Sequence, residues 1–428
     1  MYSDCKTNLA YAATGKRGVL VLLVSVIASA QLTAQNVTSP YSILGIGDIE
    51  TKNAGRYFIS GNTAISRRDP WAYNFSNPAS LTGLPLKTMH FDLLIRGKIS
   101  SFSFPDDDTA TTPSKDLILR RISLAFKVTE KTGFAFGLQP YSTVNYKLNQ
   151  NRVQLDNSTV YDKAVEGSGG LNQVYFSAGH VLGQQISAGI TASYLFGSVQ
   201  EDTRYYSSYM DITRKRSDSY SGLLVQGGLQ FYSKPGTRWN HVLGLTGSVG
   251  SKLNGQLSTE YSENSVVINK SLDDGSEFRL PLSAGVGYSA TSPAGITLSI
   301  EGGYSHWTYQ KVNYQNSYTY PTYKGGIGME YSFKDARTHT WERGFLGIGL
   351  NAENSYIRIE KQKLWDYSLS LGGGLNVSNN LSVYSGLELG QKGNKTNGQI
   401  RENYTQIVLG LTLKDLWLGT KKYGRYRD

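Results

Sequence analysis

The chain has 428 residues and a formal net charge of +10; 39% of its residues are hydrophobic and only 18% are charged. It contains 47 Gly, 30 Tyr and a single Cys. Globular domains usually carry about 25% charged residues, so this composition argues against a disordered chain and against a helical bundle. Length alone allows two or three domains or one large closed sheet, because length is only a prior for domain number.

The N-terminus has the pattern of a secretory signal peptide, which we place at residues 1–34. A segment with basic residues leads into the apolar run Val19–Ala30, which ends among small residues. The run is shorter than the roughly 20 residues of a membrane-spanning helix, and no later stretch comes close. Cleavage after Ala30 and cleavage after Ala34 both fit the pattern. Either one removes Cys5, so we expect an exported chain without disulfides, cysteine-based sites or a lipoprotein anchor.

Residues 35–85 precede the first predicted strand and are rich in Gly, Asn, Ser and Pro. This composition favours compact turns over long regular elements. We expect this segment to act as an N-terminal plug, or hatch, inside the sheet that follows.

From about residue 87 onward, stretches in which apolar residues alternate with small or polar ones are separated by breaks. The period of two predicts β-strands. The clearest case is Trp365–Val377, where Trp, Tyr, Leu and Val alternate with Asp, Ser, Gly and Asn. Fourteen such segments start near residues 87, 117, 132, 170, 185, 219, 239, 278, 294, 318, 343, 364, 380 and 400.

The breaks alternate between short turns and long polar segments. The long ones are Pro105–Asp116, Asn149–Gly169, Gln200–Asp218 and Thr259–Glu277. Such an alternation is typical of outer-membrane barrels. Strands cross a bilayer only when the sheet closes, because lipid offers no hydrogen bonds to a free edge. We therefore predict an all-β fold: a transmembrane antiparallel β-barrel of about 14 strands over residues 86–417, followed by a basic tail at residues 418–428.

This fold predicts an integral protein of the outer membrane of a Gram-negative bacterium, in contact with outer-membrane lipid. The inward positions carry many Gly, Ser and Thr, so the lumen needs an occupant. The inward charges Arg121, Glu301, Glu330 and Glu388 either hold the plug by ion pairs or line a path, and the sequence leaves both roles open.

Two short motifs in the plug segment and the end of the last strand resemble one protein family. Asn77-Pro78-Ala79 resembles the plug motif of the long-chain fatty-acid transporter family of FadL-like outer-membrane proteins. The opening residues Ser39, Pro40, Tyr41, Gly45, Gly47 and Asp48 resemble its hydrophobic-compound transporter branch, as does the closing run Gly410–Trp417. The resemblance covers the general architecture and the two ends of the barrel.

What the resemblance implies is passive uptake of a hydrophobic small molecule, such as a long-chain fatty acid or a hydrocarbon, which passes the plug and leaves sideways through the wall. A lateral exit needs an interrupted ladder, and proline interrupts ladders because it has no N–H. Pro140 lies in the third predicted strand, where the resemblance implies a kink of the wall. We name Pro140 as the candidate exit; an ordinary bulge near the strand end is the alternative.

Other chemistry has little support in the sequence. The five His residues are spread singly, so we expect no catalytic, cofactor-binding or metal site, and no enzyme. Asp106, Asp107 and Asp108 form either a calcium-attracting loop or, more simply, a solvated loop tip. Basic residues do not cluster on one face, so we expect no nucleic-acid partner.

The leading hypothesis is thus an outer-membrane uptake channel for hydrophobic small molecules. The alternative is a barrel that serves as a non-transporting subunit or docking partner of a larger outer-membrane protein secretion or assembly complex. A transporter should contain a continuous apolar pocket that runs past the plug to an opening in the wall, whereas a subunit should have a filled lumen and bind protein partners.

Overall fold

The structure is a computed structural model that describes most of the chain beyond residue 38. The described residues are 39–50, 53, 55–105, 107–154, 160–207, 210–234, 238–274, 277–310, 317–334, 342–358, 362–378, 380–395 and 398–416. The chain divides into two units between Gln35 and Asn36, and all described residues belong to the second unit. The predicted signal peptide and the predicted basic tail lie outside the described residues. In the described part, no helix has the length and hydrophobicity that crossing a membrane requires.

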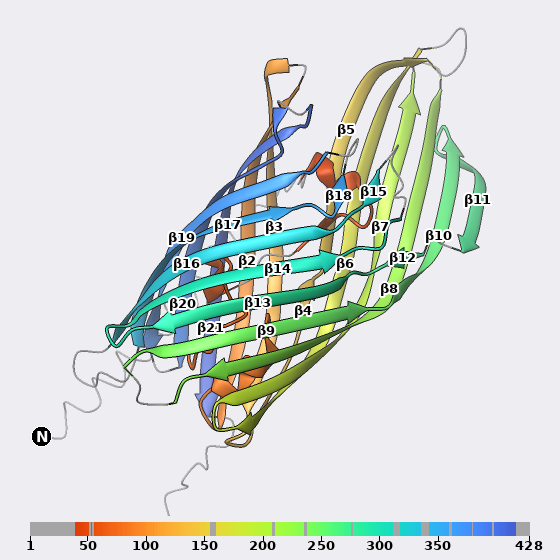
Figure 1. The fold of residues 1–428 in the computed structure, drawn as a ribbon. Coiled ribbons are helices and arrows are strands. Elements are labelled where there is room, and N and C mark those ends of the chain that lie inside the picture. Colours follow the sequence, from red (N-terminus) through yellow and green to blue (C-terminus); the bar gives the residue numbers. More distant parts are fainter. Residues whose placement is uncertain are drawn as a thin grey trace, which may run out of the picture. The chain divides into compact units, whose positions relative to one another are not determined.

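Fourteen antiparallel strands form a closed barrel (Figure 1). Eleven are continuous: β2 (Thr88–Phe104), β3 (Asp107–Lys127), β6 (Val160–Gly183), β7 (Ile186–Tyr206), β8 (Asp211–Tyr232), β14 (Ile296–His306), β16 (Thr322–Lys334), β17 (Glu342–Asn354), β19 (Trp365–Ser378), β20 (Leu381–Lys392) and β21 (Arg401–Leu416). Three are interrupted: β4 (Thr132–Pro140) with β5 (Ser142–Gln154), β9 (Asn240–Gly250) with β10 (Lys252–Glu263), and β11 (Val266–Asp274) with β12 (Phe278–Arg279) and β13 (Leu282–Thr291).

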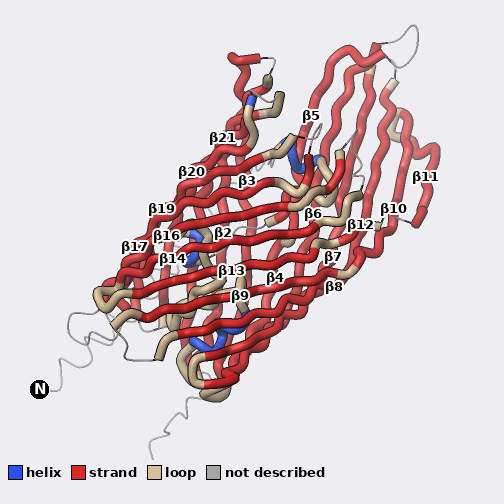
Figure 2. Tube along the Cα trace, in the orientation of Figure 1, coloured by secondary structure: helices blue, strands red, loops and turns tan. Residues whose placement is uncertain are grey.

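The last strand pairs with the first, which closes the sheet. The ladder between β2 and β21 runs from Thr88 opposite Leu416 to Ser103 opposite Arg401. A small separate sheet joins β15 (Tyr318–Thr319) to β18 (Ile357–Arg358). Figure 2 shows that strands make up most of the described chain, and that loops and short helical turns lie inside the barrel. The predicted fold class is confirmed.

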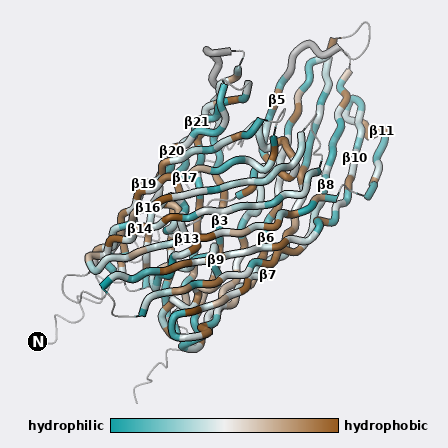
Figure 3. The backbone as a smooth tube through the Cα atoms, in the orientation of Figure 1, coloured by the Kyte–Doolittle hydropathy of each residue, from teal (hydrophilic) through white to brown (hydrophobic). Residues whose placement is uncertain are grey.

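The outer face of the wall is apolar and the inner face is small or polar. In β14, Ile296, Leu298 and Ile300 are exposed, whereas the intervening Thr297, Ser299 and Glu301 are buried. The same alternation of hydrophobic and hydrophilic residues is visible along the strands in Figure 3. Because apolar side chains on the outside are stable only in contact with acyl chains, this pattern is that of a membrane barrel.

Several strands are far longer than the roughly 9–11 residues needed to cross a bilayer. β6 has 24 residues, β7 has 21 and β8 has 22. Their extra length, together with β5, β10 and β11, forms a sheet that continues beyond one end of the barrel (Figure 1). We call this sheet the wing. It comprises β5, residues 160–168 of β6, residues 198–206 of β7, residues 211–221 of β8, β10 and β11.

Strands occupy most of the described residues in the four segments predicted as long polar loops, which corrects that prediction. The wing contains three of these segments, and β3, paired with β2, contains the fourth, Pro105–Asp116. The sequence pattern missed them because it searched for alternation between apolar and polar residues. In β11, for example, residues on both faces are exposed, so a period of two gives no signal. Hydrophilic stretches dominate β8 and β10 there (Figure 3).

The wing begins at a line of glycines with positive φ. Gly169 and Gly170 in β6 have φ of +105° and +126°, and Gly197 in β7 has φ of +152°. A Cβ on Gly197 would lie 2.2 Å from the carbonyl oxygen of Gly170. Only glycine fits this bend without strain.

The segment before the first barrel strand lies inside the barrel. It contains the short 3-10 helices η1 (Pro40–Ile43), η2 (Arg56–Phe58) and η3 (Pro78–Gly83), and the two-residue strand β1 (Asp48–Ile49). Each of the three buried hydrophobic clusters joins residues of this segment to residues of the wall. The core of the protein is therefore the contact between segment and wall, and we call residues 39–85 the plug.

The wall makes room for the plug with rows of glycine. Gly133, Gly179, Gly189 and Gly228 lie directly opposite one another on β4, β6, β7 and β8. A Cβ on Gly189 would lie 2.5 Å from the carbonyl carbon of Pro78, and one on Gly228 would lie 2.1 Å from Asn77 Oδ1. The helix η3 thus rests on bare backbone, and the small inward residues are complementary to the plug.

A side chain at Gly189 should push η3 out of its place. We expect Gly189→Val to destabilise the folded barrel by about 1–3 kcal/mol or more, because overpacking forces the backbone to shift. Thermal unfolding of the purified protein in detergent measures the effect. Gly302→Ala is the matched control, since no atom lies within 4 Å of the added Cβ. An equal decrease in stability in both variants would contradict the close contact between Gly189 and η3.

Candidate functional site

The motif Asn77-Pro78-Ala79 fastens the plug to the wall. Asn77 caps η3, because its Oδ1 accepts a hydrogen bond from the N–H of Ala79 at 3.1 Å. Its Nδ2 donates to the carbonyl of Ile65 in the plug at 2.9 Å and to that of Leu229 in β8 at 3.1 Å. Pro78 is the first residue of η3, and Ala79 is fully buried. The motif therefore acts as a structural anchor in this chain.

The first residues of the plug form hydrogen bonds with β21, with the residue before it and with β5. Ser39 Oγ lies 3.1 Å from a carboxylate oxygen of Glu402 in β21 and caps η1, which starts at Pro40. The Tyr41 hydroxyl donates to the carbonyl of Ile400. The N–H of Ser39 donates to the carbonyl of Asn145 in β5 at 3.1 Å.

Gly45, Gly47 and Asp48 shape the next turn of the plug. Both glycines have positive φ, and a Cβ on Gly47 would lie 2.4 Å from the carbonyl oxygen of Thr143. The hydroxyl of Tyr356 lies 2.8 Å from the carbonyl of Gly47. Asp48 forms an ion pair with Lys392 of β20 at 2.7 Å. Of the six motif residues, Ser39, Tyr41, Gly47 and Asp48 contact the rest of the barrel, whereas Pro40 starts η1 and Gly45 turns the chain.

A hydrophobic cluster packs this turn against the base of the wing. Leu44 and Ile46 contribute the plug side chains. The wall, the wing and the segments next to them contribute Leu171, Leu195, Tyr220, Leu253, Phe278, Leu280, Trp307, Tyr356 and Ile357.

A buried ion cluster locks the middle of the plug. Arg56 pairs with Glu330 at 2.6 Å and Glu342 at 2.7 Å, and Arg67 pairs with Glu330 at 2.6 Å. Asp69 lies 3.4 Å from Arg56. Burial alone would lower the pKa of Arg56, but the three carboxylates raise it well above its usual value.

The sequence interpretation missed Arg56 and Arg67 because their partners lie more than 260 residues away. Of the two roles left open for Glu330, the structure shows the ion pair with the plug. Glu301 holds the plug in another way, since its carboxylate accepts the backbone N–H groups of Ala64 and Ile65 at 2.7 and 2.8 Å.

A second ion cluster lies around Glu50 of the plug. Arg120 of β3 lies 2.6 Å and Arg96 of β2 lies 3.0 Å from its carboxylate. Burial would raise the pKa of Glu50, but these two guanidinium groups outweigh it and hold the pKa at about 2. The ladder shifts register where Leu94 and Ile95 face Arg121 and Leu119. This bulge turns both Arg120 and Arg121 to the interior, where Arg121 lies over the Tyr73 ring.

The wall is interrupted beside this cluster. β3 pairs with β4 only from Ile122 opposite Leu138 to Lys127 opposite Gly133. The edge of β5 that would continue this ladder instead pairs with β1, with Asp48 opposite Thr143 and Ile49 opposite Ser142. No described ladder joins β3 before Ile122 to β5, and the two ribbons separate there in Figure 1. We call this interruption the wall gap.

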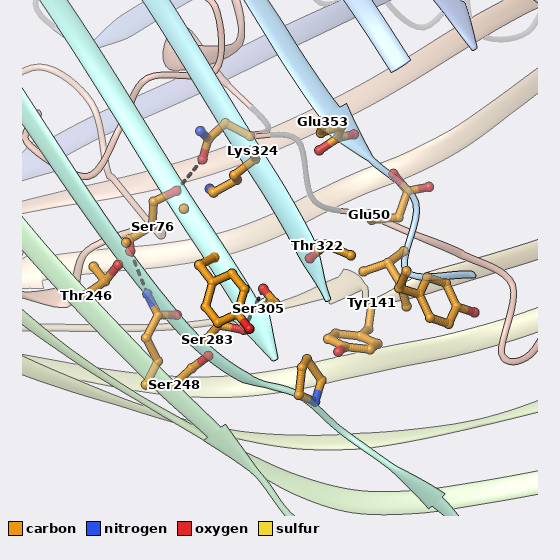
Figure 4. Close-up of a pocket in the computed structure, with 18 of the residues that line it drawn as sticks. Glu50, Ser76, Tyr141, Thr246, Ser248, Ser283, Ser305, Thr322, Lys324 and Glu353 are labelled. Carbon is orange, nitrogen blue, oxygen red and sulfur yellow. Dashed lines mark hydrogen bonds between the residues drawn. The ribbon is translucent and has the colours of Figure 1, made fainter. Parts of the chain in front are cut away.

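Pro140 is the last residue of β4 and marks one side of the wall gap. It also lines a pocket of about 300 Å³ between plug and wall, together with Tyr141 (Figure 4). The pocket contains apolar groups such as Phe75 and Trp307. It also contains charged groups of both signs: Asp48, Glu50, Arg120, Arg121, Lys324, Glu353, Asp366 and Lys392.

No group of three or more His, Cys, Asp or Glu residues in the described part is arranged to hold a metal ion. His180 and His241 have wall partners: Thr132 at 2.9 Å and Tyr288 at 2.7 Å. The side chains of Asp106, Asp107 and Asp108 lie outside the described residues, so the calcium interpretation stays a prediction.

Comparison with known proteins gives one family and several similar folds. A family model described as BamG matches residues 16–424. No curated protein matches the chain. A FadL homologue of Pseudomonas aeruginosa is 11% identical, with a TM-score of 0.57 over 87% of this chain and 99% of its own. The P. putida toluene transporter TodX is 12% identical, with a TM-score of 0.57 over 87% and 100%. The Ralstonia pickettii toluene transporter TbuX is 12% identical, with a TM-score of 0.53 over 85% and 98%.

A closed fourteen-strand wall, an apolar outer face and an N-terminal plug define an outer-membrane-type β-barrel, and the solved structures show that its fold is FadL-like. The sequence-based resemblance is thereby confirmed at the level of the fold. Within this class, the chain belongs to the BamG family.

Removing Arg56 should destabilise the protein strongly. Arg56→Ala leaves the buried Glu342 without its ion-pair partner and leaves Glu330 with Arg67 alone. Breaking a buried ion pair from one side costs about 3–5 kcal/mol. The free energy of unfolding in a urea titration measures the loss. Lys147→Ala is the control, because the Lys147–Glu166 pair is about half exposed and should contribute less than about 1 kcal/mol. A loss for Arg56→Ala as small as for the control would mean that the ion cluster does not fasten the plug.

Proposed function

We propose that the protein is a non-transporting barrel that serves as a subunit or docking partner of a larger outer-membrane protein secretion or assembly complex. The observation that carries the proposal is the match to the BamG family over residues 16–424, and we take membership of this family as the support for association with a complex. Its apolar outer face contacts outer-membrane lipid, and its wing offers a surface for proteins.

The seating of the plug supports this proposal. Glycine rows hold η3, buried ion pairs hold Arg56, and a second cluster holds Glu50. If the plug left the barrel, charged groups on the wall would lose their ion-pair partners while still buried, which costs several kcal/mol. The pocket beside it does not form a continuous apolar path, because charged groups of both signs line it. The sequence analysis expects a continuous apolar pocket of a transporter, and the pocket near Pro140 lacks that character.

Purification in a mild detergent, followed by identification of bound proteins and lipids, tests this function. We expect a stoichiometric protein partner and no fatty acid or hydrocarbon in the lumen. A barrel that purifies alone at native expression levels, with an apolar ligand bound, would contradict the proposal and favour transport.

The second candidate is passive uptake of a hydrophobic small molecule, such as a long-chain fatty acid or a hydrocarbon. The observation that favours it is the position of Pro140, which lines the pocket and ends β4 at the wall gap. A molecule in the pocket would leave sideways between β3 and β5 after the β1 edge moved. The fold shared with toluene transporters agrees with this route.

Pro140→Ala separates the two functions. The change restores a backbone N–H at the end of β4. If the wall gap is an exit, uptake of toluene or of a long-chain fatty acid by whole cells should fall several-fold. Pro321→Ala, at the start of β16, is the control. Unchanged uptake of every accepted compound would exclude Pro140 as the exit and leave the complex proposal untouched.

A further inference from the structure

The wing is a sheet with two edge strands, β5 and β11, and these differ in what pairs with their outer sides. One edge is β5 (Ser142–Gln154), and the plug covers its first four residues: β1 pairs with Ser142 and Thr143, and the N–H of Ser39 donates to the carbonyl of Asn145. The other edge is β11. It pairs with β10 from Asp274 opposite Gln256 to Val266 opposite Glu263. On its second side, no strand in the described part of the chain pairs with it.

The free side of β11 is regular beyond a bulge, and it combines four exposed apolar side chains with charged ones. From Asn269 to Asp274 the ladder to β10 continues without a shift, and a bulge lies at Ile268. Val266, Val267, Ile268 and Leu272 are each more than half exposed. Figure 1 shows the β10–β11 hairpin at the margin of the wing.

Natural proteins usually protect such an edge with proline, inward charges or a covering element, because free N–H and C=O groups pair with any available strand. The bulge at Ile268 protects one point of β11 only. The strand has no proline, and its apolar residues gather next to the bulge. An edge of this kind is the surface that strand addition uses: the main chain supplies the hydrogen bonds and the side chains supply specificity.

We propose that the free edge of β11 binds an extended strand of a partner protein, which adds to the wing as its next strand. The inference rests on the proposed function and names the contact surface for the complex. The partner strand runs along Val266–Asp274, pairs most regularly with Asn269–Asp274, and places apolar side chains against Val266, Val267 and Leu272. At the other end of the partner strand, charge determines the pairing. Lys270 already forms an ion pair with Glu260 at 3.5 Å, so the exposed Asp273 and Asp274 would pair with a basic residue of the partner.

The charged residues of β11 argue against lipid as the occupant. Lys270, Asp273 and Asp274 lie in a nine-residue strand, and charged groups in acyl chains carry a large cost. A second copy of this chain is the remaining competitor, and the experiment below distinguishes it.

The test compares three forms of the full-length protein expressed from its own locus: the unmodified chain, a double variant Val267→Lys with Leu272→Lys, and the control Val160→Lys. Val160 lies on β6 of the wing and is 54% exposed, so the control adds a charge to the same sheet away from β11. All three should unfold at the same temperature, because none of the three side chains is buried.

Each form is isolated from outer membranes in mild detergent. We expect the double variant to retain at least tenfold less of the stoichiometric partner, and the control to retain all of it. We also expect backbone amides of Asn269–Asp274 to exchange with deuterium at least tenfold more slowly in the complex than in the barrel stripped of its partner by high salt.

Three results would overturn the inference. If the double variant retains its partner fully, β11 is not the contact, although the proposed function stands. If the partner is retained but the β11 amides exchange equally fast with and without it, strand addition is excluded. If the slow exchange appears only in a dimer of this chain, the occupant is a second copy. Failure of the unmodified chain to bring any partner would instead remove both the inference and the proposed function.

Discussion

The structure depends on the contact between the plug and the inner wall of the barrel. In a soluble protein, the hydrophobic effect fills the interior with side chains from the sheets themselves. Here the apolar side chains of the wall face outward to lipid, so the interior has to be built from a separate segment. Residues 39–85 supply it, and all three buried hydrophobic clusters join that segment to the wall.

This constraint explains the composition of the wall. Inward glycines lie where the plug backbone touches the sheet, as at Gly189 against Pro78 and Gly349 against Gly61. Inward carboxylates lie where the plug offers cations or N–H groups, as Glu330 does for Arg56 and Glu301 for Ala64. The plug and the inner face of the wall therefore have complementary shapes and charges, and the pocket near Pro140 is one space that this fit leaves open.

The sequence predicts features that repeat along one strand and features that involve only residues close together in the chain. Ile296, Leu298 and Ile300 alternate with polar residues, so their strand and its outward face follow from the period of two. Asn77-Pro78-Ala79 stands out in the sequence only through the family resemblance, and its role as the cap and first residues of η3 comes from the structure. The ion pairs of Arg56 could not be predicted, since the register of the barrel brings residues more than 260 positions apart into contact.

Most of the wing was predicted as loops because its strands are exposed on both faces and lack a regular alternation of apolar and polar residues. The bulge that turns Arg120 and Arg121 inward could likewise not be predicted from the alternation of apolar and polar residues. Pro140 was placed in the correct strand, and the structure adds that the wall is interrupted beside it. Whether anything leaves there stays a prediction, whereas the interruption itself and its cover by β1 belong to the fold.

The central claim is that the plug stays seated while the protein functions. Thr63 Oγ1 of the plug lies 2.6 Å from Ser299 Oγ of β14, so Thr63→Cys with Ser299→Cys offers a reversible link between plug and wall. The most direct measurement compares the oxidised and reduced forms of this double variant in their recovery of the native partner. The account predicts equal recovery in both. A linked form that loses its partner, and regains it on reduction, would show that the plug has to move.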